Sequence, residues 1–181
     1  MAFDGVFLHK ITAELSAAEN SHVDKIYQPS KDELVFLLRK KGFVKKLLIT
    51  ARPGYARLHF TEGKYENPQT PPMFCMLMRK YLSAARLLSV TQPELERIAE
   101  LTFSTSNELG DIIEVKLIAE FLGNKTNIIL VGADGRIIDS LRRSDPEKDE
   151  RTVLPGAVYK YPDSQHKLNP VTEDILSLIH I

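Results

Sequence analysis

Short apolar segments, separated by turn residues, recur along this 181-residue chain and predict a sheet-rich fold. The segments are bounded by Gly, Pro, Asn or Asp, as is typical of β-strands joined by turns. Gly123-Asn124 and Ala133-Asp134-Gly135 lie between apolar runs and indicate tight hairpins. The predicted strands are Val23–Gln28, Glu33–Arg39, Val44–Thr50, Ala56–Phe60, Leu88–Gln92, Arg97–Ser104, Ile112–Leu122, Asn127–Val131 and Arg136–Ser140.

Two other segments show the 3.6-residue spacing of amphipathic helices. The first begins after Asp4, a residue type that caps helix N-termini, and ends near Asn20-Ser21. The second is predicted over Pro72–Leu88, with Pro72 in the first turn, where its missing N–H costs nothing. The apolar face of this second helix comprises Phe74, Leu77, Met78, Tyr81, Ala85 and Leu88, with Cys75 at the margin.

The order of these elements predicts the fold class. Strands and helices do not alternate as in a doubly wound sheet, so we predict an α+β fold. Its form is an antiparallel β-sandwich or barrel flanked by two helices. We assign residues 1–143 to this domain and residues 144–170, which are polar and proline-rich, to a loop or linker packed on it. Residues 171–181 resemble the start of a truncated following helical domain.

Composition restricts how the protein could bind nucleic acid and indicates the compartment in which it works. The formal net charge is zero, so nucleic-acid binding would have to use a local basic patch. A single cysteine, Cys75, cannot form an internal disulfide and favours a reducing compartment. There is no signal-peptide pattern and no apolar run near the roughly 20 residues needed to span a bilayer. We therefore expect a cytoplasmic protein without membrane association.

Motifs for catalysis or cofactor binding are missing from the sequence. The five histidines do not form an HExxH or a paired-ligand spacing, and one cysteine does not make a zinc site. There is no Walker loop, no GxGxxG and no recognisable nucleophile motif. The sequence therefore predicts no metal and no cofactor, and none of its motifs requires an enzyme.

Basic residues form two candidate groups of phosphate contacts. The first crowds one predicted hairpin end and comprises Arg39, Lys40, Lys41, Lys45 and Lys46, and a local patch of this kind can position phosphates. The same lysines also suit a charged hairpin that blocks edge-to-edge strand pairing.

Arg79, Arg86 and Arg97 form the second group. Arg79 and Arg86, on the polar side of the predicted second helix, are either solvated helix charges or a phosphate-facing edge, and the sequence leaves both interpretations open.

Four stretches of the sequence resemble the NFACT family. They are AFDGVFLHKITAEL, TARPGYARLHFTEGKYENPQTPPMFCMLMRKYL, NELGDIIEVKLIAEFLGNKTNIILV and RTVLPG. They occur in matching order from Met1 to about Tyr161. Bacterial members of the family include ribosome-associated quality-control factors, and many are catalogued as fibronectin-binding protein A.

The resemblance implies a fold and a set of partners. It implies likeness to the N-terminal domain of formamidopyrimidine-DNA glycosylases. It also implies binding to the obstructed 50S ribosomal subunit with stalled peptidyl-tRNA, and recruitment of tRNA (alanyl-tRNA in bacteria) for template-free C-terminal tailing. The peptide-bond chemistry would belong to the ribosome. Glycosylase chemistry is not expected, because Ala2 and Phe3 replace the Pro-Glu pair of those enzymes.

Three residues match positions that the family links to function. Asp4 matches an early family aspartate, and Glu96-Arg97 matches an Asp-Arg pair linked to tRNA recruitment and tailing. Glutamate at position 96 keeps the charge but places the carboxylate one methylene farther from the backbone. Asp4 also suits a plain helix cap and Arg97 a surface charge at a strand end, so these interpretations remain open.

Two other functions remain alternatives. One is an adhesin that binds fibronectin at the cell surface, as the older family name suggests. The other is a glycosylase-like nucleic-acid-binding domain without catalytic residues.

Overall fold

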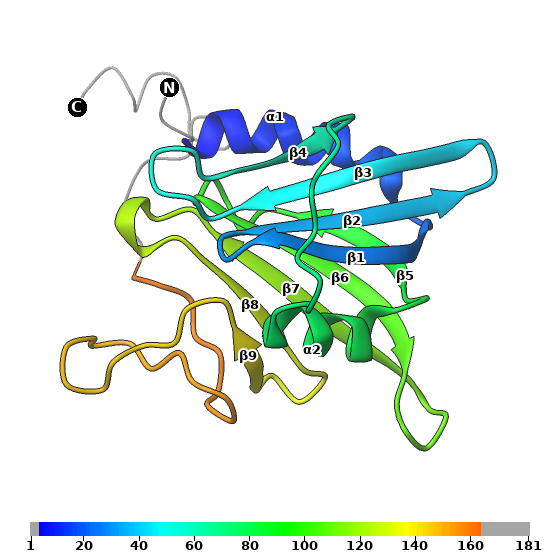
Figure 1. Ribbon diagram of the computed structural model, residues 1–181. Helices are drawn as coiled ribbons and strands as arrows, with labels where there is room; N and C mark the ends of the chain where they lie inside the picture. The colour runs from blue at the N-terminus through cyan, green and yellow to red at the C-terminus, as the bar shows by residue number, and fades with distance from the viewer. Residues whose placement is uncertain (1–3, 164–181) are drawn as a thin grey trace.

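The computed structural model describes residues 4–163 (Figure 1). Every strand predicted from the sequence is present, with ends that differ by one or two residues at most. The described elements in chain order are α1 (Gly5–Leu15), η1 (Ser16–Ala18), β1 (His22–Ser30), β2 (Glu33–Lys40), β3 (Phe43–Thr50), β4 (Arg57–Thr61), α2 (Met73–Leu82), β5 (Arg86–Thr91), β6 (Ile98–Ser106), β7 (Ile112–Glu120), η2 (Gly123–Lys125), β8 (Asn127–Val131) and β9 (Ile137–Ser140).

The strands form one antiparallel sheet that is folded over on itself. Its order is β4-β3-β2-β1-β5-β6-β7-β8-β9, and the junction between β1 and β5 is a single residue pair, His22 with Arg86. Beyond that pair the two strands diverge, so the β1–β4 half lies across the β5–β9 half (Figure 1). The predicted α+β class is confirmed, in the sandwich form rather than the barrel form, because β4 and β9 end the described sheet.

The hydrophobic core lies between the two halves. Phe36 of β2 and Phe103 of β6 stack with their ring centres 6.5 Å apart. The helix α1 contacts β4, β5 and β6 and buries Leu8 and Leu15, whereas α2 contacts β1 and β6 and buries Met78. The two helices therefore close two open sides of the folded sheet (Figure 1).

The predicted C-terminal end of α2 is wrong. The helix ends at Leu82 rather than Leu88, and Arg86 begins β5. Residues 83–85 leave the helix to pair with β1, where Ala84 N–H donates to Val23 O at 3.0 Å and Val23 N–H donates to Ala85 O at 2.9 Å. Tertiary strand pairing thus overrides the helical spacing of the sequence.

The position predicted for Cys75 is also wrong. Its side chain is fully buried in the core rather than at the margin of the helix. Burial raises the pKa of the Cys75 thiol, with the Arg79 charge acting in the opposite direction.

Residues 144–163, hereafter the covering segment, pack on the outer face of β6, β7 and β8. Val153 joins a second apolar cluster with Ile98, Ile118 and Ile129 on that face. The segment also pairs with the start of β9, where Ile137 N–H donates to the Ala157 carbonyl at 2.8 Å. The domain boundaries predicted at residues 143 and 170 stay a prediction, and residues 171–181 lie outside the described residues.

Candidate nucleic-acid interface

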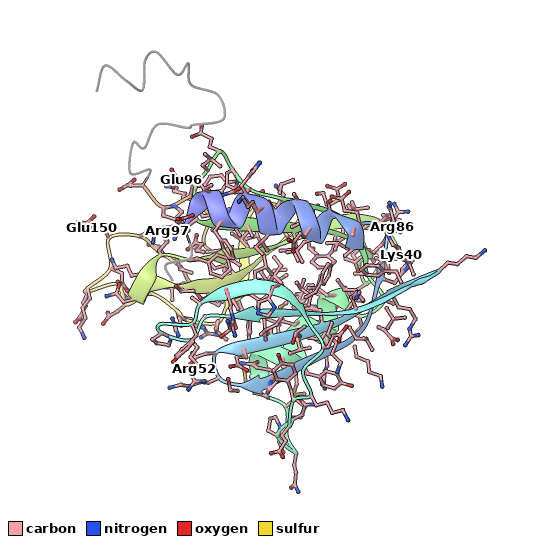
Figure 2. The ribbon with its side chains drawn as sticks, turned by 90° about the horizontal axis from the view of Figure 1, so that it is seen from above. Lys40, Arg52, Arg86, Glu96, Arg97 and Glu150 are labelled. Carbon is pink, nitrogen blue, oxygen red and sulfur yellow. The ribbon has the colours of Figure 1, made fainter. Side chains whose placement is uncertain are left out.

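The fold brings Asp4, Glu96 and Arg97 to one end of α1. Gln92, which follows β5, donates from Nε2 to the Gly5 carbonyl at 2.8 Å and to the Glu96 carbonyl at 2.7 Å. Figure 2 shows Glu96 and Arg97 beside the end at which α1 begins. Residues that are about ninety positions apart in the sequence thus form one surface, which we call the α1 N-terminal cluster.

The turn that carries Glu96 and Arg97 is tightly fixed. Glu96 N–H donates to the Pro93 carbonyl at 3.1 Å, and Glu94 adopts a left-handed backbone with φ of 51°. Phe121 N–H donates to the Arg97 carbonyl at 2.8 Å, which holds Arg97 beside the end of β7. Both site side chains remain partly exposed, so they are available to a ligand.

Charge at this end of α1 is mixed. The exposed Asp4 carboxylate accepts a hydrogen bond from Phe7 N–H at 2.8 Å, which confirms the predicted helix cap. The N-terminal end of a helix carries partial positive charge, and this field favours carboxylates such as those of Asp4 and Glu96. Arg97 adds a cation beside them, so the cluster offers one positive group for a phosphate and two acceptors for N–H or O–H donors.

Substitutions at Asp4 separate its capping role from a role of its charge. Asp4→Ala is expected to lower the free energy of unfolding by about 1 kcal/mol, because the Phe7 N–H loses its acceptor. Asp4→Asn should retain stability, since asparagine caps helices about as well as aspartate. Thermal denaturation of both variants measures this difference. Equal losses in the two variants would show that the side-chain cap is not the stabilising contact.

The lysine group lies at the opposite end of α1, roughly 16 Å along an 11-residue helix. Lys40 Nζ donates to the carbonyls of Ala17 and Glu19, at 2.8 Å each, and so satisfies backbone acceptors after α1. Lys46 Nζ donates to the Gly63 carbonyl at 3.2 Å. Two of the four lysines predicted to contact phosphate are therefore engaged in holding the fold.

The other basic residues predicted to contact phosphate differ in whether their side chains already have a partner within the protein. Lys41, Lys45 and Arg86 are exposed and have no side-chain partner within residues 4–163. Arg79 is different, because its Nε donates to the Ile26 carbonyl at 2.9 Å and its guanidinium lies 5.9 Å from the Tyr27 ring centre. Arg79 thus fastens α2 to β1, a role that helical spacing did not suggest.

A cleft of about 870 Å³, not anticipated from the sequence, lies between η2, residues 142–151 and residues 160–163. One of its walls is Arg142, which donates to Thr126 O at 2.7 Å, Asp32 Oδ1 at 2.9 Å and Ala51 O at 2.9 Å. These contacts join the two halves of the sheet. No local pattern marks Arg142, because its partners lie up to 110 residues away.

Among residues 4–163, no group of three or more His, Cys, Asp or Glu side chains is arranged to hold a metal ion. In the same part of the chain, neither helix has the length and apolarity needed to cross a bilayer.

The domain is an α+β fold in which two helices close a folded antiparallel sheet. A charged cluster lies at the N-terminal end of α1. The chain matches the family model for NFACT N-terminal and middle domains over residues 4–180, and it belongs to that family. The predicted family membership is therefore confirmed. The predicted likeness to glycosylase N-terminal domains stays a prediction.

Individual relatives are consistent with this membership. The chain is 42% identical over 182 residues to the Rqc2 homolog RqcH of Bacillus subtilis. It is 30% identical over 164 residues to the archaeal Rqc2 homolog aRqcH of Methanocaldococcus jannaschii. The alignments cover 97% and 88% of this chain but 32% and 23% of the relatives, so the chain spans a third or less of their length.

A solved structure shares the fold closely. The N-terminal domain of the fibronectin-binding protein PavA from Streptococcus pneumoniae superposes with a TM-score of 0.92 at 38% identity. The superposition covers 99% of this chain and 71% of that chain.

Proposed function

We propose that this chain is the N-terminal module of a cytoplasmic ribosome quality-control factor that binds the obstructed 50S subunit and recruits tRNA for C-terminal tailing of stalled nascent chains. The observation that carries the proposal is the α1 N-terminal cluster. Family resemblance singles out Asp4 and the Glu96-Arg97 pair, and the Gln92 bonds to the Gly5 and Glu96 carbonyls join the start of α1, which Asp4 caps, to the turn that carries this pair. Figure 2 shows Glu96 and Arg97 beside that end of α1. Family membership and the names of the Rqc2 homologs support the same function.

The cluster suits substrate positioning rather than catalysis. Arg97 presents a guanidinium that pairs with phosphate, while Asp4 and Glu96 accept hydrogen bonds from base or sugar donors. Because the net charge of the chain is zero, such contacts act locally and do not produce general affinity for polyanions. The ribosome would supply the peptide-bond chemistry.

The test compares the two ends of α1 in the full-length protein. Arg97→Ala is expected to weaken tRNA binding and co-sedimentation with obstructed 50S subunits at least about tenfold, the usual scale for a lost charge-assisted contact. Arg86→Ala, an exposed arginine at the other end (Figure 2), is the matched control and should bind nearly as the wild type does. If Arg86→Ala weakened binding more than Arg97→Ala, the interface would lie at the lysine end of α1. If the wild-type protein bound neither tRNA nor 50S subunits, the proposed function would be refuted.

Fibronectin binding is a second candidate, favoured by the likeness to the PavA N-terminal domain. Surface plasmon resonance with immobilised fibronectin would test it on the same protein. We expect the Arg97→Ala substitution to leave any such binding unchanged, because a protein ligand of that kind has no need of the phosphate contact.

A further inference from the structure

The turn between β3 and β4 presents an aromatic ring to solvent beside a cation. Tyr55 is 61% exposed, and the Arg52 guanidinium lies 5.4 Å from the centre of its ring. The Tyr55 hydroxyl has no partner among the described residues. Because Tyr55 is largely exposed and Arg52 lies against its ring, the two side chains offer a planar surface to a ligand.

The backbone beneath this ring is fixed. Tyr55 N–H donates to the Arg52 carbonyl at 2.9 Å, and Gly54 supplies the left-handed conformation of the turn with φ of 79°. The preceding Ala51 is buried, donates its N–H to the Asp32 carbonyl at 2.8 Å and accepts from Arg142 Nη2 at 2.9 Å. A platform held in this way loses little conformational freedom when it binds a ligand.

Arg142 connects the platform to the cleft described above. The same guanidinium that holds the Ala51 carbonyl also lines the cleft. Lys125 and Lys160 line it without a side-chain partner within the described residues. Figure 2 shows Arg52, Glu150 of the cleft and the Glu96-Arg97 pair at the same end of the molecule.

We propose that Arg52 and Tyr55 form a stacking platform for an unpaired RNA base, with the flanking phosphates lying toward Lys125 and the cleft. Unpaired bases are commonly recognised by stacking on aromatic rings and arginine planes, with basic grooves that follow the backbone. A protein partner would instead need a contiguous apolar surface, and Pro53, Gly54 and Arg57 do not provide one. This inference rests on the proposed RNA-directed function and adds a contact site to it.

The experiment measures RNA affinity of the full-length protein with two fluorescent probes, an intact tRNA and an unpaired 12-nucleotide RNA. Tyr55→Ala is expected to weaken binding of both probes roughly 5- to 100-fold, the range for loss of one stacked base. Tyr55→Phe should bind as the wild type does, because it keeps the ring. Met73→Ala, at an 81% exposed apolar position on α2, is the surface control and should have no effect.

Any other outcome contradicts either the stacking platform or the proposed function. Wild-type affinity of Tyr55→Ala refutes the platform, and equal loss in Tyr55→Phe assigns the effect to the hydroxyl instead. Binding of the 12-nucleotide RNA without binding of tRNA or 50S subunits refutes the proposed function but leaves the platform standing. Loss of fibronectin binding with unchanged RNA binding shows that the turn is a protein contact.

Discussion

Arg151→Ala is expected to lower the free energy of unfolding by about 3–5 kcal/mol, because it leaves a buried carboxylate without its charge partner. Glu120 on β7 is 1% exposed. Arg151 Nη1 and Nη2 donate to its two oxygens at 2.8 and 2.6 Å, in a bidentate pair. After the substitution the Tyr159 hydroxyl, at 2.7 Å, would be the one side-chain donor to Glu120 left among residues 4–163. Urea denaturation followed by circular dichroism measures the loss.

Two companion variants test the cause of that loss. Arg143→Ala removes an arginine that also pairs with a carboxylate, Asp139, but the Arg143 side chain is exposed, so this substitution should cost much less stability than Arg151→Ala. The double variant Arg151→Met with Glu120→Leu should be more stable than Arg151→Ala alone, because it removes the buried charge as well. A single variant within about 0.5 kcal/mol of the wild type would show that Glu120 is solvated and not held by Arg151.

The Glu120–Arg151 pair belongs to a network that fastens the covering segment to the sheet. Burial lowers the pKa of Arg151, but the hydrogen bonds to Glu120 and the charge of this carboxylate together raise the pKa above its ordinary value. Burial and Glu120 both raise the pKa of Tyr159. Tyr161 donates to Glu100 of β6, and burial and this carboxylate raise its pKa to about 12. Arg97, Ile98 and Glu100 are close in sequence, so the network also braces the strand that begins at the candidate site.

Local patterns predicted the strands well because alternation and turn residues are local properties. They failed where a distant partner decides the structure. The charge run DPEKDER reads as a solvated loop, yet the Arg151 that ends it pairs with a carboxylate 31 residues earlier. Residues 83–85 read as helix, yet they pair with β1. Arg79 likewise reads as a surface charge, yet its Nε bonds the Ile26 carbonyl.

The candidate site, too, could not be predicted from local sequence patterns. Family resemblance, and not spacing, singled out Asp4, Glu96 and Arg97. Their convergence depends on how closely the start of α1 approaches the turn after β5, and no sequence window contains both. Gln92, which donates to both segments, carries no motif that would have drawn attention to it.

Gly5→Ala is expected to damage the candidate site more than any surface substitution near it. A Cβ at this position would lie 1.8 Å from the Leu95 carbonyl oxygen, a backbone atom that cannot rotate away. The start of α1 and the turn that carries Glu96 must therefore separate, and the Gln92 bond to the Gly5 carbonyl is strained or lost. We expect a stability loss of about 1–3 kcal/mol or more, as for overpacked sites.

The same substitution should weaken tRNA binding by the full-length protein at least as much as Arg97→Ala, because it displaces the whole α1 N-terminal cluster rather than one charge. Gly63→Ala is the matched control, since the atoms nearest to the added Cβ belong to the Tyr65 and Thr61 side chains, at 3.2 and 3.3 Å, and not to the backbone. If Gly5→Ala lowers stability but binds tRNA as the wild type does, the close approach of α1 to residues 92–96 serves the fold alone. If it lowers binding at temperatures where the protein is fully folded, that approach sets the geometry of the interface.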